Sequence, residues 1–321
     1  MAVYVNTNYS ALQGQRYLGN VQNQLTTTYQ RLSSGMRINS AKDDAAGLQI
    51  ADRLTSQING LNQGNRNASD GIALAQTMEA GMDEISGMLQ KIRTLTVQAA
   101  NGTNTTEDRT ALGKEIASLA TEVNRIAQQT TFAGKTILNG KTKTGSIFGD
   151  DAGAQGNALA GAAGAMTLQV GSNKGDTITF TANSVMFSSI GTSQDLIKED
   201  GSTFFKTTAT GEVQVLVDKL NFADQTNAKY VGKVIELMDS MISKVDGYRA
   251  DLGAIQNRLE SSIRNQSNVA ANEADARSRI RDADFAEESA NLSQQSIIQQ
   301  AASSMLMQAN TRPQLGLSLL G

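Results

Sequence analysis

Apolar residues fall on a heptad repeat between Val231 and Leu259, and polar residues fill the positions between them. One set of heptad positions holds Val231, Met238, Val245, Leu252 and Leu259, and the other holds Val234, Met241, Tyr248 and Ile255. This spacing is typical of a helix that packs against another helix along a narrow seam. Such a helix is marginal alone in water, so the pattern predicts a partner elsewhere in the chain.

The best complementary stripe lies in the N-terminal half. It comprises Leu54, Leu61, Ala68, Ala75, Met82 and Leu89, flanked by Ile58, Ile72, Ile85 and Ile92. We therefore expect the two halves of the chain to form one long antiparallel, coiled-coil-like rod. The same segment contains Gly60, Gly64, Gly71, Gly81 and Gly87. Each glycine costs up to about 1 kcal/mol relative to alanine, so packing must supply this helix with its stability.

Two further signals place the boundaries of the N-terminal helices. Residues 10–32 carry a thin apolar stripe at helical spacing, and Gly35 is suited to the left-handed conformation that ends helices. Ser40 and Asp43 form a capping-box pattern, which predicts a second helix over residues 44–100.

A third helix and a hairpin are predicted next. Thr105 and Asp108 form another capping pattern, and apolar residues recur at helical spacing over 112–126. Residues 131–138 then have a strand, turn and strand pattern. The third helix is expected to fold back on the second.

The composition changes over residues 141–220, where Gly, Ala, Ser, Thr and Asp dominate and residues 151–165 form a low-complexity run. Alternating apolar positions predict short strands; they are Met166, Leu168 and Val170, then Ile178 and Phe180, and later Val213, Val215 and Val217. We expect a small β-rich domain with a weak core, inserted between the helical halves and facing outward.

The C-terminal part is expected to be helical again. The heptad helix should run from about residue 223 to 272, and Asp284 with Glu287 can cap a last helix that ends before Pro313. The predicted fold class is therefore mainly α. Its parts are an N-terminal helix (1–42), the N-terminal half of a helical shell with a hairpin (43–140), the outer domain (141–220), the C-terminal half of the shell (221–281) and a C-terminal helix (282–321).

Composition argues against an enzyme. The chain has no His and no Cys, which excludes His-based triads, Cys nucleophiles, disulfides and the usual zinc or iron sites, and we expect no metal and no cofactor. The net charge of -3 makes nucleic acid an unsuitable partner. No segment has the pattern of a secretory signal or the length of a transmembrane helix, so no membrane insertion is expected.

Two segments resemble bacterial flagellin: LSSGMRINSAKDDAAGL at residues 32–48 and ARSRIRDAD at residues 276–284. The resemblance covers roughly residues 1–140 and 220–321. It implies a subunit of the flagellar filament that supports swimming motility, with terminal helices in an inner tube and long helices in a surrounding shell. It also implies type III export in an unfolded state and secretion to the extracellular flagellum. The implied partners are an export chaperone and the hook-associated junction and cap proteins.

The terminal helices are the predicted surface for self-assembly, because we find no other element in the chain that would cover them. The residues expected to carry this contact are Leu18, Val21, Leu25, Leu32, Phe285, Leu292, Ile297, Ile298 and Met305. Such helices should be disordered in the monomer and order when neighbours cover them. Head-to-tail contacts that do not close into a ring give a helical homopolymer.

Residues 90–98 resemble the flagellin segment that a Toll-like innate receptor recognises. The implied contact residues are Gln90, Lys91, Arg93, Leu95, Gln98 and Glu115. The chain departs from the recognised pattern by having Lys91 in place of Arg and Thr94 in place of Glu. A lysine cannot form a bidentate fork, which predicts weaker recognition. The alternative interpretation of this surface is packing between subunits of the shell.

Two alternative functions make different predictions. A hook-filament junction protein of the same superfamily shares the terminal helices but is present in few copies, so its abundance in sheared surface protein would distinguish it. An enzyme inserted in the filament would need catalytic residues within 141–220, and a metalloprotease would need His. The heptad seams themselves are expected to form an intramolecular core.

Overall fold

A computed structural model describes residues 7–140, 145–148, 163–191, 205–207, 213–215 and 225–318. The chain divides into a terminal unit, Met1–Asn59 with Asn268–Gly321, and a central unit, Gly60–Ser267. The division falls inside helices α2 (Ala45–Ala99) and α5 (Gln225–Arg281), which contribute to both units. The division between the two units, at 59/60 and 267/268, does not coincide with the domain boundaries that the sequence suggests at 42/43 and 281/282.

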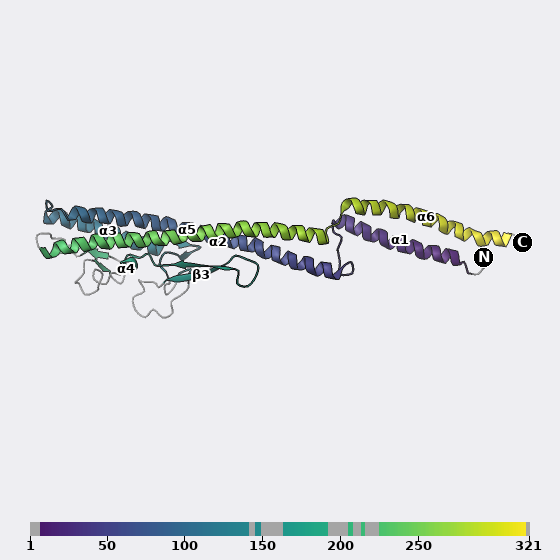
Figure 1. The fold of residues 1–321 in the computed structure, drawn as a ribbon, viewed down its shortest axis with the longest axis horizontal. Helices are drawn as coiled ribbons and strands as arrows, with labels where there is room; N and C mark the ends of the chain where they lie inside the picture. Colours follow the sequence, from purple (N-terminus) through teal and green to yellow (C-terminus); the bar gives the residue numbers. More distant parts are fainter. Residues whose placement is uncertain are drawn as a thin grey trace. The chain divides into compact units, whose positions relative to one another are not determined.

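The core of the central unit is a seam between α2 and α5, which Figure 1 shows running alongside each other. The buried seam residues are Leu61, Ala68, Ala75, Met82, Ile85, Leu89, Ile92, Val234, Met238, Met241, Val245, Leu252, Ile255 and Leu259. Leu54, Ile72 and Tyr248 are half-buried, and the side chain of Val231 lies outside the described residues. The fold class is confirmed as a helical rod with a small β-rich part.

Polar contacts along the seam show that α2 and α5 are antiparallel. Arg93 pairs with Asp239, Asp83 with Arg249, and Glu79 accepts a hydrogen bond from Gln256. Partner numbers on α5 rise as those on α2 fall, so the two helices run in opposite directions, as the stripes predicted.

Helix α3 (Thr106–Gln129) follows a short connection and is capped as predicted. The Thr105 hydroxyl accepts a hydrogen bond from the Asp108 backbone N–H, and the Asp108 carboxylate accepts one from the Thr105 backbone. The Thr105 hydroxyl also donates to the Asp108 carboxylate (2.8 Å), and the two bonds that this carboxylate accepts, first the one from the Thr105 backbone and then the one from its hydroxyl, lower the pKa of Asp108. Apolar residues on one face of α3, among them Ile116 and Val123, join the core of the central unit.

The predicted hairpin after α3 is present. Strand β1 (Thr131–Phe132) pairs antiparallel with β2 (Lys135–Thr136). The two residues between the strands, Ala133 and Gly134, have φ of 51° and 79°. A turn with two positive φ angles matches the twist of the strands, and glycine tolerates this conformation best.

A second hairpin, β3 (Gly164–Gln169) with β4 (Thr177–Ala182), lies against α2. It confirms the predicted alternation, since Ile178 and Phe180 are buried and Met166 and Leu168 pack against the core. The short helix α4 (Phe187–Ile190) adds Phe187 and Ile190 to the same core. The apolar side chains of residues 164–190 are part of the same core as those of the helices, so this part of the β-rich segment does not have a separate core.

The glycines of α2 explain how the hairpin fits. A Cβ added at Gly64 would overlap the carbonyl of Val170, and one added at Gly71 or Gly81 would meet the side chain of Leu168 or Leu138. Gly60 likewise faces Ser172, whereas nothing lies near Gly87. Four of the glycines that weaken α2 therefore make room for the chain packed on it.

A third pair of strands, β5 (Phe205–Thr207) and β6 (Val213–Val215), is antiparallel. Strand β6 covers two of the three alternating valines predicted there. Val217 and most of the low-complexity run lie outside the described residues.

The terminal unit contains α1 (Tyr9–Ser34) and α6 (Phe285–Ser318). Helix α1 ends at Gly35, whose φ of 68° is left-handed as predicted. The connections that follow α1 and α5 are joined by backbone hydrogen bonds. Arg37 donates to the carbonyl of Arg281 (2.7 Å), and Ala283 donates to that of Gly35 (3.0 Å).

Three predicted boundaries in the terminal unit need correction. The N-terminus of α2 is capped by Asp44, whose carboxylate accepts from the Gly47 N–H, whereas Asp43 accepts from Asn39 and Ser40 in the preceding turn. Helix α5 continues to Arg281, and its charged end is stabilised within the helix by an Arg279–Asp275 ion pair. Helix α6 does not stop before Pro313 but continues to Ser318.

Candidate self-assembly surface

Helices α1 and α6 pack on each other in an antiparallel pair. Val21, Leu25 and Thr28 of α1 and Ala302 of α6 are buried in the terminal unit. The expectation that no other element covers the terminal helices is therefore wrong for one face of each, because the two helices cover each other.

Polar contacts fix the register of this pair. The Thr28 hydroxyl donates to the Gln295 side chain (3.2 Å). Arg31 forms an ion pair with Glu288 (3.1 Å), and the Glu288 side chain is buried. Near the ends of the chain, the Asn8 side chain donates to the backbone carbonyl of Ala309 (2.8 Å). The contacts therefore hold the pair at both ends.

Large apolar side chains of both helices remain in contact with solvent. They are Tyr9, Leu12, Tyr17, Tyr29, Phe285, Ile297, Met305 and Met307. Ile297 is 67% exposed and Met305 is 70% exposed. Exposed apolar surface on this scale marks a contact site for another protein chain.

The residues predicted for self-assembly therefore separate into two groups. Val21 and Leu25 are buried in the α1–α6 contact, and Leu18, Leu32, Leu292 and Ile298 are half-buried. Phe285, Ile297 and Met305 are exposed, and Met305 also lines a groove between the two helices. Five of the exposed residues, Tyr9, Leu12, Tyr17, Tyr29 and Met307, are absent from the predicted set, and all but Tyr29 lie off the apolar stripes from which candidates were chosen.

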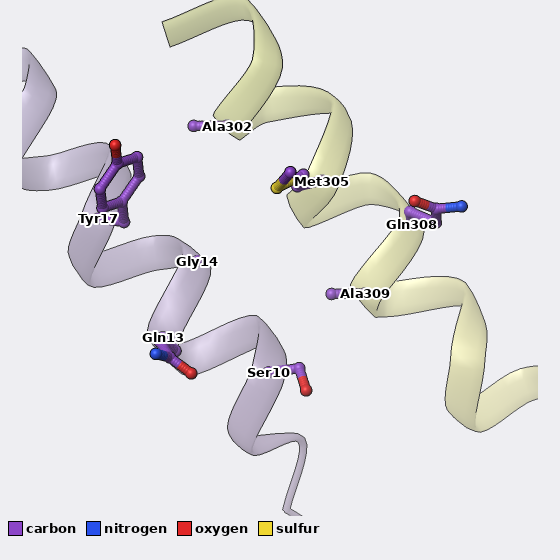
Figure 2. A pocket seen from close by; sticks show the side chains of 8 residues that line it. All are labelled: Ser10, Gln13, Gly14, Tyr17, Ala302, Met305, Gln308 and Ala309. Carbon is purple, nitrogen blue, oxygen red and sulfur yellow. The ribbon is translucent and has the colours of Figure 1, made fainter. Parts of the chain in front are cut away.

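A groove of about 570 Å³ lies between the two helices near the ends of the chain. It is lined by Ser10, Gln13, Gly14 and Tyr17 from α1 and by Ala302, Met305, Gln308 and Ala309 from α6. Figure 2 shows Ala302 and Ala309 projecting from α6 toward α1, while Gln308 points away from it. The small residues leave the groove open.

The candidate receptor surface lies on the central unit. Gln90, Lys91, Arg93, Gln98 and Glu115 are exposed. Lys91 pairs with Glu115 across α2 and α3 (3.0 Å), and the Arg93 guanidinium contacts both carboxylate oxygens of Asp239 (2.5 and 3.4 Å).

Leu95 does not belong to that surface, because it is 8% exposed and is part of the core. The apolar side chain that is exposed in this stretch is Val97, at 48%.

The described residues contain no cluster of three or more His, Cys, Asp or Glu side chains that could hold a metal ion. Over the same part of the chain, no helix combines the length and apolar character needed to cross a membrane.

Family models match most of the chain. The bacterial flagellin N-terminal helical region matches residues 5–143, and the bacterial flagellin C-terminal helical region matches residues 235–320. Flagellin D of Vibrio anguillarum is 37% identical over 377 residues, and flagellin C of Vibrio cholerae is 37% identical over 385 residues. Both alignments cover all of this chain and all of the relative.

A solved structure shares the fold. A chain from Vibrio parahaemolyticus that is assigned as a flagellar hook-associated protein has a TM-score of 0.55 and 17% sequence identity, and the match covers 75% of this chain and 100% of that one. This likeness shows the fold alone. The matched helical regions include both α1 and α6 and leave out residues 144–234, and relatives aligned over their full length are flagellins, so the chain belongs to the bacterial flagellin family.

Proposed function

We propose that α1 and α6 form the surface through which this flagellin binds its neighbours, and that both helices become ordered as they do so. Family membership makes the chain a structural subunit that self-polymerises into the flagellar filament and not an enzyme. The observation that supports the proposal is the set of large apolar side chains that both helices leave exposed.

The energetics of the terminal unit favour ordering on assembly. Helix α1 has 26 residues, and the residues it buries are Val21, Leu25 and Thr28. Fixing the backbone costs about 1–2 kcal/mol per residue, whereas burying a large apolar side chain contributes roughly 1.5–3 kcal/mol. The contact between α1 and α6 is too small to offset that cost, and covering their outer faces in a polymer would add the missing burial.

Limited proteolysis tests this proposal. In a verified monomer, protease should trim residues up to about 40 and from about 282 onward and spare the central unit, and helical content by circular dichroism should rise on polymerisation. Filaments should protect both ends. Ends that resist protease in the monomer as well as the filament would show that the terminal helices are already ordered before assembly.

The remaining partners belong to the same proposal. An unfolded subunit exported to the cell exterior must not cross-link, and this chain has no Cys. The broad apolar face of α6 is suited to an export chaperone before assembly, and the same helix pair suits junction and cap proteins at the filament ends, since all would bind the surface that subunits use.

We also propose that the monomer binds the Toll-like innate receptor through Gln90, Lys91, Arg93, Gln98 and Glu115. The support is that these five polar side chains are exposed on α2 and α3. Leu95 is not part of the proposed contact because its side chain is buried.

The substitution Lys91→Arg should increase receptor signalling, because arginine keeps the ion pair with Glu115 and adds a fork that binds a carboxylate in two places. A reporter cell line that expresses the receptor gives the readout. Lys114→Arg, at an exposed position of α3, is the matched control and should leave the signal unchanged. Arg93→Ala should lower the signal without changing stability, since exposed ion pairs contribute little. No response to either Lys91→Arg or Arg93→Ala would exclude this surface.

A further inference from the structure

Pro313 lies inside α6, four residues after Ala309 and five residues before the helix ends at Ser318. In an α-helix, the backbone N–H of each residue donates to the carbonyl four residues earlier. Proline has no N–H, and its ring presses against that same carbonyl. The carbonyl of Ala309 therefore has no helical donor, and the helix would ordinarily kink or end at this point.

The missing donor comes from the other end of the chain. The side-chain amide of Asn8 donates to the carbonyl of Ala309 at 2.8 Å. The other atom of the same side chain, Oδ1, accepts from the backbone N–H of Ala11 at 3.2 Å and caps the start of α1. The two contacts fix the amide orientation, because turning it over would place two acceptors against each other and two donors against each other.

We propose that Asn8 replaces the hydrogen bond that Pro313 cannot form, and that this exchange couples the docking of α1 to the continuation of α6 beyond Ala309. The inference deepens the proposed function, because it rests on the pairing of α1 with α6. The Asn8 side chain caps the N-terminus of α1 and also donates a hydrogen bond to the last turns of α6. Neither helix therefore reaches its full length at this end unless the other is in place.

The same contact selects the register of the pair. Proline leaves one carbonyl on α6 without a helical donor, and the cap of α1 provides one amide that reaches it. Gly14 lies one turn and a half further along α1, where an added Cβ would come within 3.2 Å of Leu306. Sliding α1 by one turn would leave Ala309 unpaired and would move a bulkier residue than glycine against Leu306. The cost of an unpaired carbonyl thus opposes misregistered docking.

A double-mutant cycle tests the coupling. Asn8→Asp keeps a good N-cap but offers no donor to Ala309. Asn8→Ser also keeps a good N-cap, lacks the side-chain amide that donates to Ala309, and adds no charge. Pro313→Ala restores the backbone N–H. The full chain should be polymerised, and amide exchange should be measured by mass spectrometry on peptides covering residues 303–318, with a peptide from α2 as the internal reference.

With Pro313 present, either Asn8 variant should speed exchange in this segment about tenfold, as expected for the loss of a partner of a part-buried carbonyl. In the Pro313→Ala background, the same variants should change exchange by less than about twofold, since the helix then supplies its own donor. Asn310→Asp, at an exposed position of the same segment, is the control and should change little.

An equal effect of the Asn8 variants in both backgrounds would overturn the coupling, and so would the absence of any effect with Pro313 present. If an Asn8 variant does not polymerise, the critical concentration for polymerisation is measured in place of amide exchange. Polymerisation that returns when Pro313→Ala is added supports the coupling. Polymerisation that does not return refutes it. Failure of this coupling can be distinguished from failure of the proposed assembly surface. The assembly surface is tested separately, by substituting an exposed apolar residue such as Ile297, which does not alter the contact between Asn8 and Ala309.

Discussion

The substitution Ile297→Asp is expected to abolish polymerisation while leaving the central unit folded. Ile297 is 67% exposed in the subunit, so an aspartate there costs the isolated chain little. In the filament the same position would be covered by a neighbour. Losing the burial of isoleucine removes about 1.5–3 kcal/mol per contact, and burying an unpaired carboxylate adds a larger cost. The critical concentration should therefore rise about 100-fold or more.

The measurement is sedimentation of seeded filaments, together with urea unfolding of the monomer. Gln300→Asp is the matched control, because it places the same charge on an exposed polar position of α6 and removes no apolar side chain. It should still polymerise. If Ile297→Asp forms filaments at the normal concentration, the outer face of α6 is not an assembly surface.

The substitution Gly64→Ala is expected to lower the free energy of unfolding of the central unit by about 1–3 kcal/mol, the range for overpacking a filled core. The added Cβ would overlap the backbone carbonyl of Val170, so the β3–β4 hairpin must shift away from α2. Helix propensity acts in the opposite direction, by up to about 1 kcal/mol, and the steric term must exceed it.

Gly87→Ala provides the matched comparison in the same helix. Nothing lies within 4 Å of a Cβ at Gly87, and the position is exposed, so alanine should raise the unfolding free energy by about 0.5–1 kcal/mol. Urea unfolding followed by circular dichroism measures both variants. Two changes of the same sign would mean that the hairpin does not rest on Gly64 in solution.

The sequence was most informative where the physical pattern is local and repeated. The heptad from residue 231 to 259 and the stripe from 54 to 89 predicted which faces of α2 and α5 are buried, because a long helix repeats the same requirement every turn. The cap at Thr105 and the end of α1 at Gly35 were also predictable, since both depend on residues within one turn.

Contacts that do not repeat along a helix were not predictable from such patterns. The glycines of α2 were recognised as a cost, but their use became clear only when the hairpin was seen against them. Pro313 was expected to end α6 because proline normally does, and the expectation failed because the compensating donor is Asn8, at the other end of the sequence. Leu95 appeared suitable for an exposed contact, yet it faces the core.

The backbone bonds between the two connections have a mechanical consequence for a filament subunit under load. A pull on α1 and α6 reaches α2 and α5 through two covalent segments, 35–44 and 282–284. The bonds from Arg37 to Arg281 and from Ala283 to Gly35 tie these segments together, so one cannot extend without straining the other. Tensile load is thereby shared between two backbone segments, so a subunit should resist stretching more than it would if a single segment carried the load.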